Sequence, residues 1–92
     1  MNGDEFLESE SIKITLRLFS SARDLAGFGE STIHLPRGAR TSDVLASLEK
    51  DNPEFVEWRK VVRLAVNFEY VSDDHLLKDG DEVAVIPPVS GG

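Results

Sequence analysis

The 92-residue chain contains no cysteine. Disulfide bonds, thiolate metal sites and cysteine nucleophiles are therefore excluded. Its two histidines, His34 and His75, lie far apart without the spacing of metal ligands, and we expect both on the surface. The sequence also lacks a Walker loop, a dinucleotide-binding fingerprint and a nucleophile elbow. We therefore expect no stably bound cofactor, no metal site, and no catalytic group other than the end of the chain itself.

Basic residues and long apolar runs are also scarce. The chain has 10 lysines and arginines against 17 aspartates and glutamates, a net charge of −7. This balance argues against a nucleic-acid partner, whose phosphates need a basic surface, and is compatible with steering towards a basic protein. No apolar run reaches the length of a membrane span, and residues 1–5 lack the features of a secretory signal. We therefore expect no membrane partner and a location in the cytoplasm.

The last residues, Pro87-Pro88-Val89-Ser90-Gly91-Gly92, form the segment that we expect to carry the function. Two final glycines put no side chain beside the terminal carboxylate, so this end can thread into a narrow active site. The two prolines fix φ and stiffen the root of the tail. Such a segment reaches at most about 20 Å, enough to enter a partner's pocket while the domain stays outside. The alternative is a frayed terminus without a role.

The composition divides the chain into three parts. Residues 1–10 are acidic and are expected to form a mobile leader, residues 11–86 form one domain, and residues 87–92 form the extended tail. The domain begins with a predicted strand, because aliphatic residues at every second position share one face. These residues are Ile12, Ile14, Leu16 and Leu18.

Two helices are predicted from capping signals and apolar spacing. Ser20 is a plausible N-cap for a short helix over residues 21–26, which ends at Gly27. Thr41 is a good N-cap for a longer helix over residues 42–51. One apolar stripe of the longer helix is expected to face the core. Its members are Val44, Leu45 and Leu48.

Further strands are predicted over residues 31–35, 61–66, 70–72 and 82–86, with a tight turn at Gly80 before the last one. The order of elements is that of an α+β domain, for which one mixed sheet packed on one main helix is the economical solution. The sequence therefore predicts a β-grasp, or ubiquitin-like, fold from which the flexible Gly-Gly tail emerges.

Some apolar residues fall out of phase with the helix-facing set. Phe19 and Ile86 are predicted on the opposite sheet face, together with Ala65, Ala84 and Tyr70. A large contiguous apolar patch is uncommon on a monomer, so this set predicts a partner-binding surface beside the root of the tail. The alternative is that the leader or a loop covers these side chains, or that they lie singly.

Three parts of the sequence resemble the small subunit of molybdopterin synthase, a ubiquitin-like sulfur carrier. They are FSSARDLAG at residues 19–27, AVN at residues 65–67, and DGDEVA at residues 79–84 followed by PPVSGG at residues 87–92. The combination of DGDEVA with PPVSGG is specific to that family, whereas Gly-Gly alone would be weak support for the resemblance. The resemblance covers residues 12–92, and the acidic leader has no counterpart in the core of that family.

The resemblance implies a role in molybdenum-cofactor biosynthesis. In that family an adenylating enzyme related to ubiquitin activators (E1-like) uses ATP and magnesium to convert the terminal carboxylate to an acyl-adenylate. A sulfur donor then displaces AMP and leaves a thiocarboxylate. The tail next enters the large subunit of molybdopterin synthase, where sulfur passes to precursor Z (cyclic pyranopterin monophosphate). The working enzyme is a heterotetramer of two small and two large subunits, and its catalytic pocket is expected on the large subunit.

The residues of this chain fit that chemistry. A carboxylate is a poor acyl donor, and a mixed anhydride with AMP removes the obstacle. With no cysteine, only the carboxylate of Gly92 can hold the sulfur, and Gly91 gives steric clearance. The residues expected to guide the tail are Pro87, Pro88, Val89 and Ser90. Those expected to dock on a partner are Phe19, Tyr70 and Ile86.

Three alternatives remain open from the sequence. A sulfur carrier for thiamine thiazole synthesis or for tRNA thiolation would use the same chemistry for another product. A protein modifier would join Gly92 to lysines of target proteins through an isopeptide bond. A purely non-covalent interaction domain would not need its tail.

Overall fold

The computed structural model describes residues 10–88 of the chain. Two sets of predictions lie outside the described residues. One is the mobile acidic leader, apart from Glu10. The other comprises the tail positions Val89, Ser90, Gly91 and Gly92.

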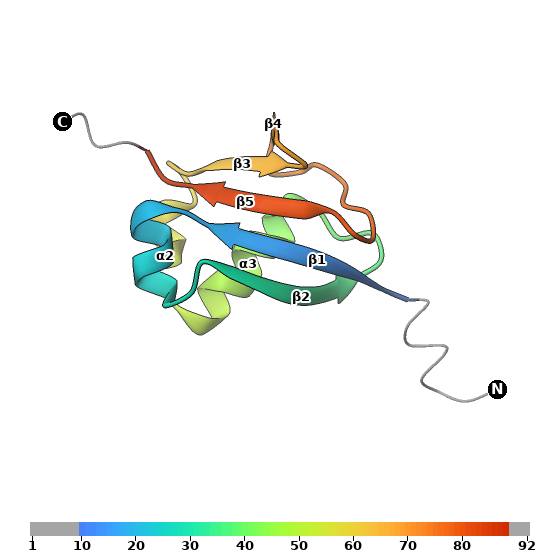
Figure 1. The fold of residues 1–92 in the computed structure, drawn as a ribbon, viewed down its shortest axis with the longest axis horizontal. Coiled ribbons are helices and arrows are strands. Elements are labelled where there is room, and N and C mark those ends of the chain that lie inside the picture. The colour runs from blue at the N-terminus through green and yellow to red at the C-terminus, as the bar shows by residue number, and fades with distance from the viewer. Residues whose placement is uncertain (1–9, 89–92) are drawn as a thin grey trace.

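A five-stranded mixed sheet forms the centre of the structure (Figure 1). Its strands are β1 (Ser11–Leu18), β2 (Glu30–Pro36), β3 (Arg63–Val66), β4 (Glu69–Val71) and β5 (Glu82–Ile86). Across the sheet their order is β2-β1-β5-β3-β4. The central neighbours β1 and β5 run parallel, whereas the other neighbouring pairs are antiparallel. The first and last strands along the described chain therefore lie side by side.

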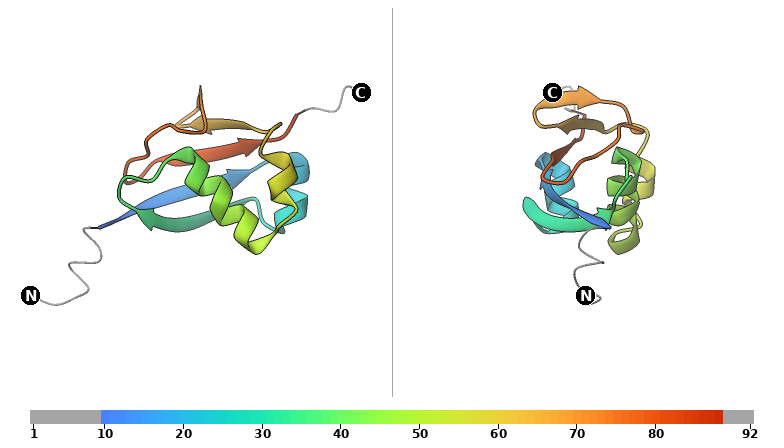
Figure 2. Two further views of the ribbon diagram at one scale, coloured as in Figure 1. Left: turned by 180° about the vertical axis from the view of Figure 1, so that it is seen from behind. Right: turned by 90° about the vertical axis from the view of Figure 1, so that its right-hand side faces the viewer.

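Helices cover one face and one end of this sheet. They are α2 (Ser20–Ala26), α3 (Thr41–Asp51) and α4 (Phe55–Trp58). Figure 2 shows α3 lying across one face of the sheet, which leaves the opposite face, here called the outer face, without a helix over its centre. This arrangement confirms the predicted α+β fold, a β-grasp with one main helix.

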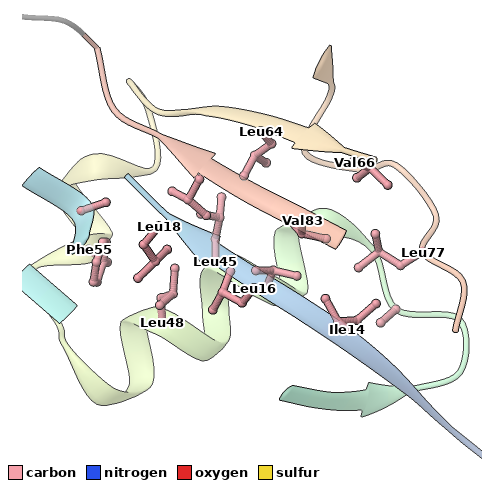
Figure 3. Close-up of a cluster of buried hydrophobic side chains, with 14 of the residues drawn as sticks. Ile14, Leu16, Leu18, Leu45, Leu48, Phe55, Leu64, Val66, Leu77 and Val83 are labelled. Atoms are coloured by element: carbon pink, nitrogen blue, oxygen red, sulfur yellow. The ribbon is translucent and has the colours of Figure 1, made fainter. Parts of the chain in front are cut away.

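The core lies between α3 and the sheet (Figure 3). Alternation along β1 buries the four predicted aliphatic side chains, and α3 buries its predicted stripe against them. The stripe residues Val44, Leu45 and Leu48 are at most 4% exposed. Truncating a buried leucine to alanine in such a core costs about 2–5 kcal/mol of folding free energy. Apolar residues recur at every second position along β1 and at every third or fourth position along α3. These two spacings determine which face of the strand meets which face of the helix.

The predicted helix caps are wrong at both helices. Ser20 is the first residue of α2 and has a φ of +53°, while Phe19 occupies the N-cap position without a side-chain hydrogen bond. Thr41 is the first residue of α3, and Arg40 precedes it as the N-cap. The Thr41 hydroxyl is fully buried and bonds outside the helix: it donates to the Ser72 carbonyl (2.7 Å) and accepts from the His75 N–H (3.2 Å). It therefore ties α3 to the loop after β4.

Strand boundaries shift by a residue or two from the prediction. The third strand starts at Arg63 instead of Val61, because the N–H groups of Val61 and Val62 donate to the Trp58 carbonyl and prolong the turn after α4. The short strand β4 begins at Glu69, one residue earlier than predicted. The predicted tight turn before β5 is confirmed, and Gly80 adopts a φ of +91° there.

Candidate functional site

The outer face of the sheet carries a row of residues that face one another across four strands. Tyr70 of β4 is paired with Ala65 of β3, Ala65 with Ala84 of β5, and Ala84 with Arg17 of β1. Side chains directly opposite in neighbouring strands lie on the same face of a sheet. Because the two central members are alanines, side chains in the middle of the row project less from the sheet than those of Tyr70 and Arg17 at its ends.

Larger apolar side chains surround the two alanines. The aromatic residues are exposed: Phe19 to 45%, Phe68 to 88% and Tyr70 to 66%, while Ile86 is half-buried. Together with Arg17 and Glu82, these residues enclose a hollow of about 240 Å³. We call the apolar members the outer patch: Phe19, Ala65, Phe68, Tyr70, Ala84 and Ile86. The structure thus places the three predicted docking residues around one concave surface.

Charged groups border the outer patch. Arg17 forms an ion pair with Glu82 (2.8 Å) and a longer one with Glu30 (3.4 Å), and the Arg63 guanidinium lies 5.5 Å from the centre of the Tyr70 ring. Half-exposed ion pairs of this kind contribute little to stability. An apolar centre with aromatic residues and a polar rim is typical of protein–protein interfaces.

Phe68 is a member of the outer patch that the sequence analysis missed. It follows Asn67 in the two-residue turn between β3 and β4, and both residues have positive φ, +51° and +72°. Such a turn favours Asn-Gly, so a bulky ring occupies the position where glycine is preferred. The turn is held against this strain by Asn67, whose side chain donates to Asp81 (2.9 Å) and accepts from the Glu82 N–H (3.0 Å). The sequence signal that could have identified Phe68 is its position directly after an asparagine in a turn.

The root of the tail lies beside the outer patch. Ile86 is the last residue of β5, and the next residue, Pro87, is buried, while Pro88 is exposed. The two prolines line a shallow hollow of about 160 Å³ together with Trp58 and Val61. Because proline fixes φ, few backbone conformations are open to the chain where it leaves β5.

Two ionisable groups among the described residues have shifted pKa values. A hydrogen bond from the Ser72 hydroxyl (2.6 Å) lowers the pKa of Asp74, and the bidentate bond with Glu49 raises the pKa of Arg59. Neither group borders the outer patch. Within residues 10–88, no three histidines, aspartates or glutamates gather as metal ligands would, and no helix is long and apolar enough to cross a bilayer.

Comparisons with known proteins agree with this architecture. The sequence pattern of the ThiS family matches residues 16–92. The molybdopterin synthase sulfur carrier subunit of Arabidopsis thaliana is 39% identical over 92% of this chain and 88% of its own length. That of Chlamydomonas reinhardtii is 43% identical over 88% of this chain and 100% of its own.

A solved structure shows the same fold in a similar sequence. It is the chain of Pyrococcus furiosus assigned as subunit 1 of molybdopterin converting factor. This protein superimposes with a TM-score of 0.76 at 41% identity, over 85% of this chain and 99% of its own. The family pattern, the related sequences and the solved structure each match most of this chain. The chain belongs to the ThiS family, alongside these molybdopterin synthase sulfur carrier subunits.

Proposed function

We propose that this chain is the sulfur carrier subunit of a molybdopterin synthase and that Gly92 carries the sulfur. The observation that carries the proposal is the similarity to named sulfur carrier subunits at 39% and 43% identity over most of the chain. The family match runs through residue 92, so the Gly-Gly segment belongs to the matched region. The outer patch beside Pro87 supplies a surface on which a partner that receives the tail can dock.

The proposed chemistry takes place at the carboxyl group of Gly92. A carboxylate oxygen attacks the α-phosphorus of ATP in the E1-like partner, which forms the acyl-adenylate and releases pyrophosphate. Hydrosulfide from the sulfur donor then attacks the activated carbonyl carbon, and AMP leaves with the bonding electron pair. The product is a thiocarboxylate. The thiocarboxylate sulfur then bonds to a carbon of precursor Z in the large subunit, and water cleaves the acyl carbon–sulfur bond, which leaves the sulfur on precursor Z and returns Gly92 to a carboxylate.

The outer patch is assigned to partner docking. Its aromatic members can bury large areas at little entropic cost, since each ring has few rotatable bonds. Docking there would bring the large subunit against the root of the tail, so that Pro87 and Pro88 aim the last residues into its pocket. The proposed complex contains two small and two large subunits, and its location is the cytoplasm.

Mass spectrometry of the intact protein tests the proposal. Incubation with the activating enzyme, ATP, magnesium and a sulfide source is expected to replace one oxygen by sulfur. Deleting Gly92 or changing Gly91 to isoleucine should abolish the mass change, because the first removes the reacting group and the second crowds it. Lys60→Ala, at an exposed position that does not line the outer patch, serves as a control and should keep it. An unchanged mass for the wild-type protein under these conditions would contradict the proposal.

Genetic complementation distinguishes the pathways that use this chemistry. In strains that lack one sulfur carrier each, the chain is expected to restore molybdoenzyme activity and not thiazole synthesis or tRNA thiolation. Recovery of thiazole synthesis alone would assign the chain to the thiamine pathway. Isopeptide bonds between Gly92 and lysines of other proteins in cell extracts would instead identify a protein modifier.

A further inference from the structure

Strand β2 lies at an edge of the sheet, with β1 as its one neighbour in the described part of the chain (Figure 1). The pairs Lys13–His34 and Thr15–Thr32 are directly opposite in this antiparallel ladder. On β1, the Lys13 carbonyl accepts from the Gly80 N–H (2.8 Å) and the Thr15 N–H donates to Asp81 (3.0 Å), so both residues bond away from β2. Their partners must then turn their own backbone groups away from β1. The N–H and C=O groups of Thr32 and His34 therefore line the open edge.

A groove runs between this edge and helix α3. Its volume is about 550 Å³, compared with about 240 Å³ for the hollow of the outer patch. Its floor includes half-buried Leu35 and the small side chains of Ala46 and Ser47. A strand added beside β2 would point every second side chain over this groove. The small helix residues leave room for an apolar side chain there.

The charge of the groove is opposite to that of the whole chain. Arg37 and Lys50 line it, whereas the chain carries a net charge of −7. Asp43 is the single acid among the described residues of the lining, and its carboxylate already accepts a hydrogen bond from the Arg40 N–H (2.7 Å). Charge complementarity between partners suppresses wrong pairings and speeds association. Acidic side chains that flank an apolar one fit this lining.

We propose that the β2 edge and its groove dock an extended acidic segment of a partner protein. The segment adds a strand to the sheet through the backbone of Thr32 and His34, a known mode of peptide recognition. Pro36 of β2 is opposite Ser11 at the start of β1, whereas β5 runs parallel to β1 and ends beyond it at Ile86. Groove and tail root thus lie at opposite ends of the sheet, and this partner can bind while the tail is engaged. The inference goes beyond the proposed function and does not depend on it.

A nuclear magnetic resonance titration with a synthetic peptide, Asp-Glu-Val-Ile-Val-Glu-Asp, tests the proposal. Amide shifts are expected at Thr32, at His34 and along the groove side of α3. Lys50→Glu is expected to weaken binding about 10-fold, because it reverses a charge on the rim. Lys60→Glu is the matched control, since Lys60 is exposed and does not line the groove, and it should bind nearly as the wild type does.

A second pair of variants tests the backbone contacts. Thr32→Pro removes one outward N–H and no hydrogen bond to β1, so it should fold and lose binding, whereas Thr32→Ala keeps the N–H and should bind. A peptide methylated at alternate backbone nitrogens keeps the charge and should fail to bind, which decides the point even if Thr32→Pro does not fold. Equal binding of the methylated peptide would overturn the proposal. So would shifts confined to the outer patch, or shifts at β2 that depend on protein concentration without peptide, which would indicate a second copy of the chain.

Discussion

Replacing Phe68 with glycine is expected to stabilise the folded chain while it weakens the proposed complex with the large subunit. Phe68 has a φ of +72° and is 88% exposed. A residue with a Cβ at positive φ destabilises the folded state by about 1–2 kcal/mol. Glycine has more conformational freedom in the unfolded chain, which lowers the stability of a glycine variant by roughly 0.5–1 kcal/mol. Because the exposed ring contributes little packing energy, folding should gain about 0.5–1 kcal/mol in total.

The same substitution removes an aromatic side chain from the outer patch. A phenylalanine can bury about 150–250 Å² at an interface. Since Phe68 is 88% exposed, most of that area is available to a partner. Truncation of an aromatic anchor costs about 2 kcal/mol or more of binding free energy. The dissociation constant for the large subunit should therefore rise about 30-fold.

Two measurements separate these effects. Urea unfolding followed by the fluorescence of Trp58 gives the stability, and calorimetric titration with the purified large subunit gives the affinity. Leu76→Ala is the control, because Leu76 is also apolar and 48% exposed but does not belong to the outer patch. Unchanged affinity of Phe68→Gly would refute the docking role of the patch. A loss of stability would refute the reasoning about strain.

Three further changes test particular contacts. Thr41→Val keeps the volume but leaves the carbonyl of Ser72 and the N–H of His75 without their buried partner, so urea unfolding should show a loss of about 1–3 kcal/mol; a loss below about 0.5 kcal/mol would contradict the buried link. Ser72→Ala should raise the pKa of Asp74 towards its ordinary value in a carboxyl titration by nuclear magnetic resonance. Because the wild-type pKa of Asp74 is lowered, its contribution to stability is complete above the ordinary carboxyl pKa and is lost as the pH falls through the lowered value. The Ser72→Ala variant should lack this part of the acid sensitivity. An unchanged pKa of Asp74 in the variant would exclude the hydrogen bond as the main cause of the shift. Gly80→Ala should cost about 0.5–1 kcal/mol of stability, because the strain of a Cβ at a φ of +91° exceeds the gain from a stiffer unfolded chain and nothing lies within 4 Å of the added Cβ; a thermal unfolding temperature equal to that of the wild type would contradict it.

The sequence predicted well those features that depend on neighbouring residues. The alternation from Ile12 to Leu18 and the stripe that contains Val44 and Leu48 are periodic within one element, so each identifies its buried face without knowledge of the fold. The glycine turn before β5 was predicted for the same reason. Once these faces are known, one mixed sheet against one main helix is the arrangement that buries them all.

Features that depend on distant residues were missed. Thr41 looks like a cap, but its hydroxyl bonds to residues 31 and 34 positions away, which no local pattern reveals. Phe68 lies in a turn, where alternation no longer tells which face a side chain joins. Lys50 lies on the polar side of a helix, and only the position of the β2 edge shows that it borders a groove. The pairing of strands is the information that these predictions needed.

The parallel pair at the centre of the sheet has a mechanical consequence. β1 and β5 are the first and last strands of the described chain, and they are direct neighbours with the same direction. A force that pulls Ser11 and Ile86 apart would slide one strand along the other, so the ladder between them would have to yield in shear, with all its bonds strained together. A partner that pulls on the end of β5 would therefore move the whole folded domain and would not detach β5 from the sheet.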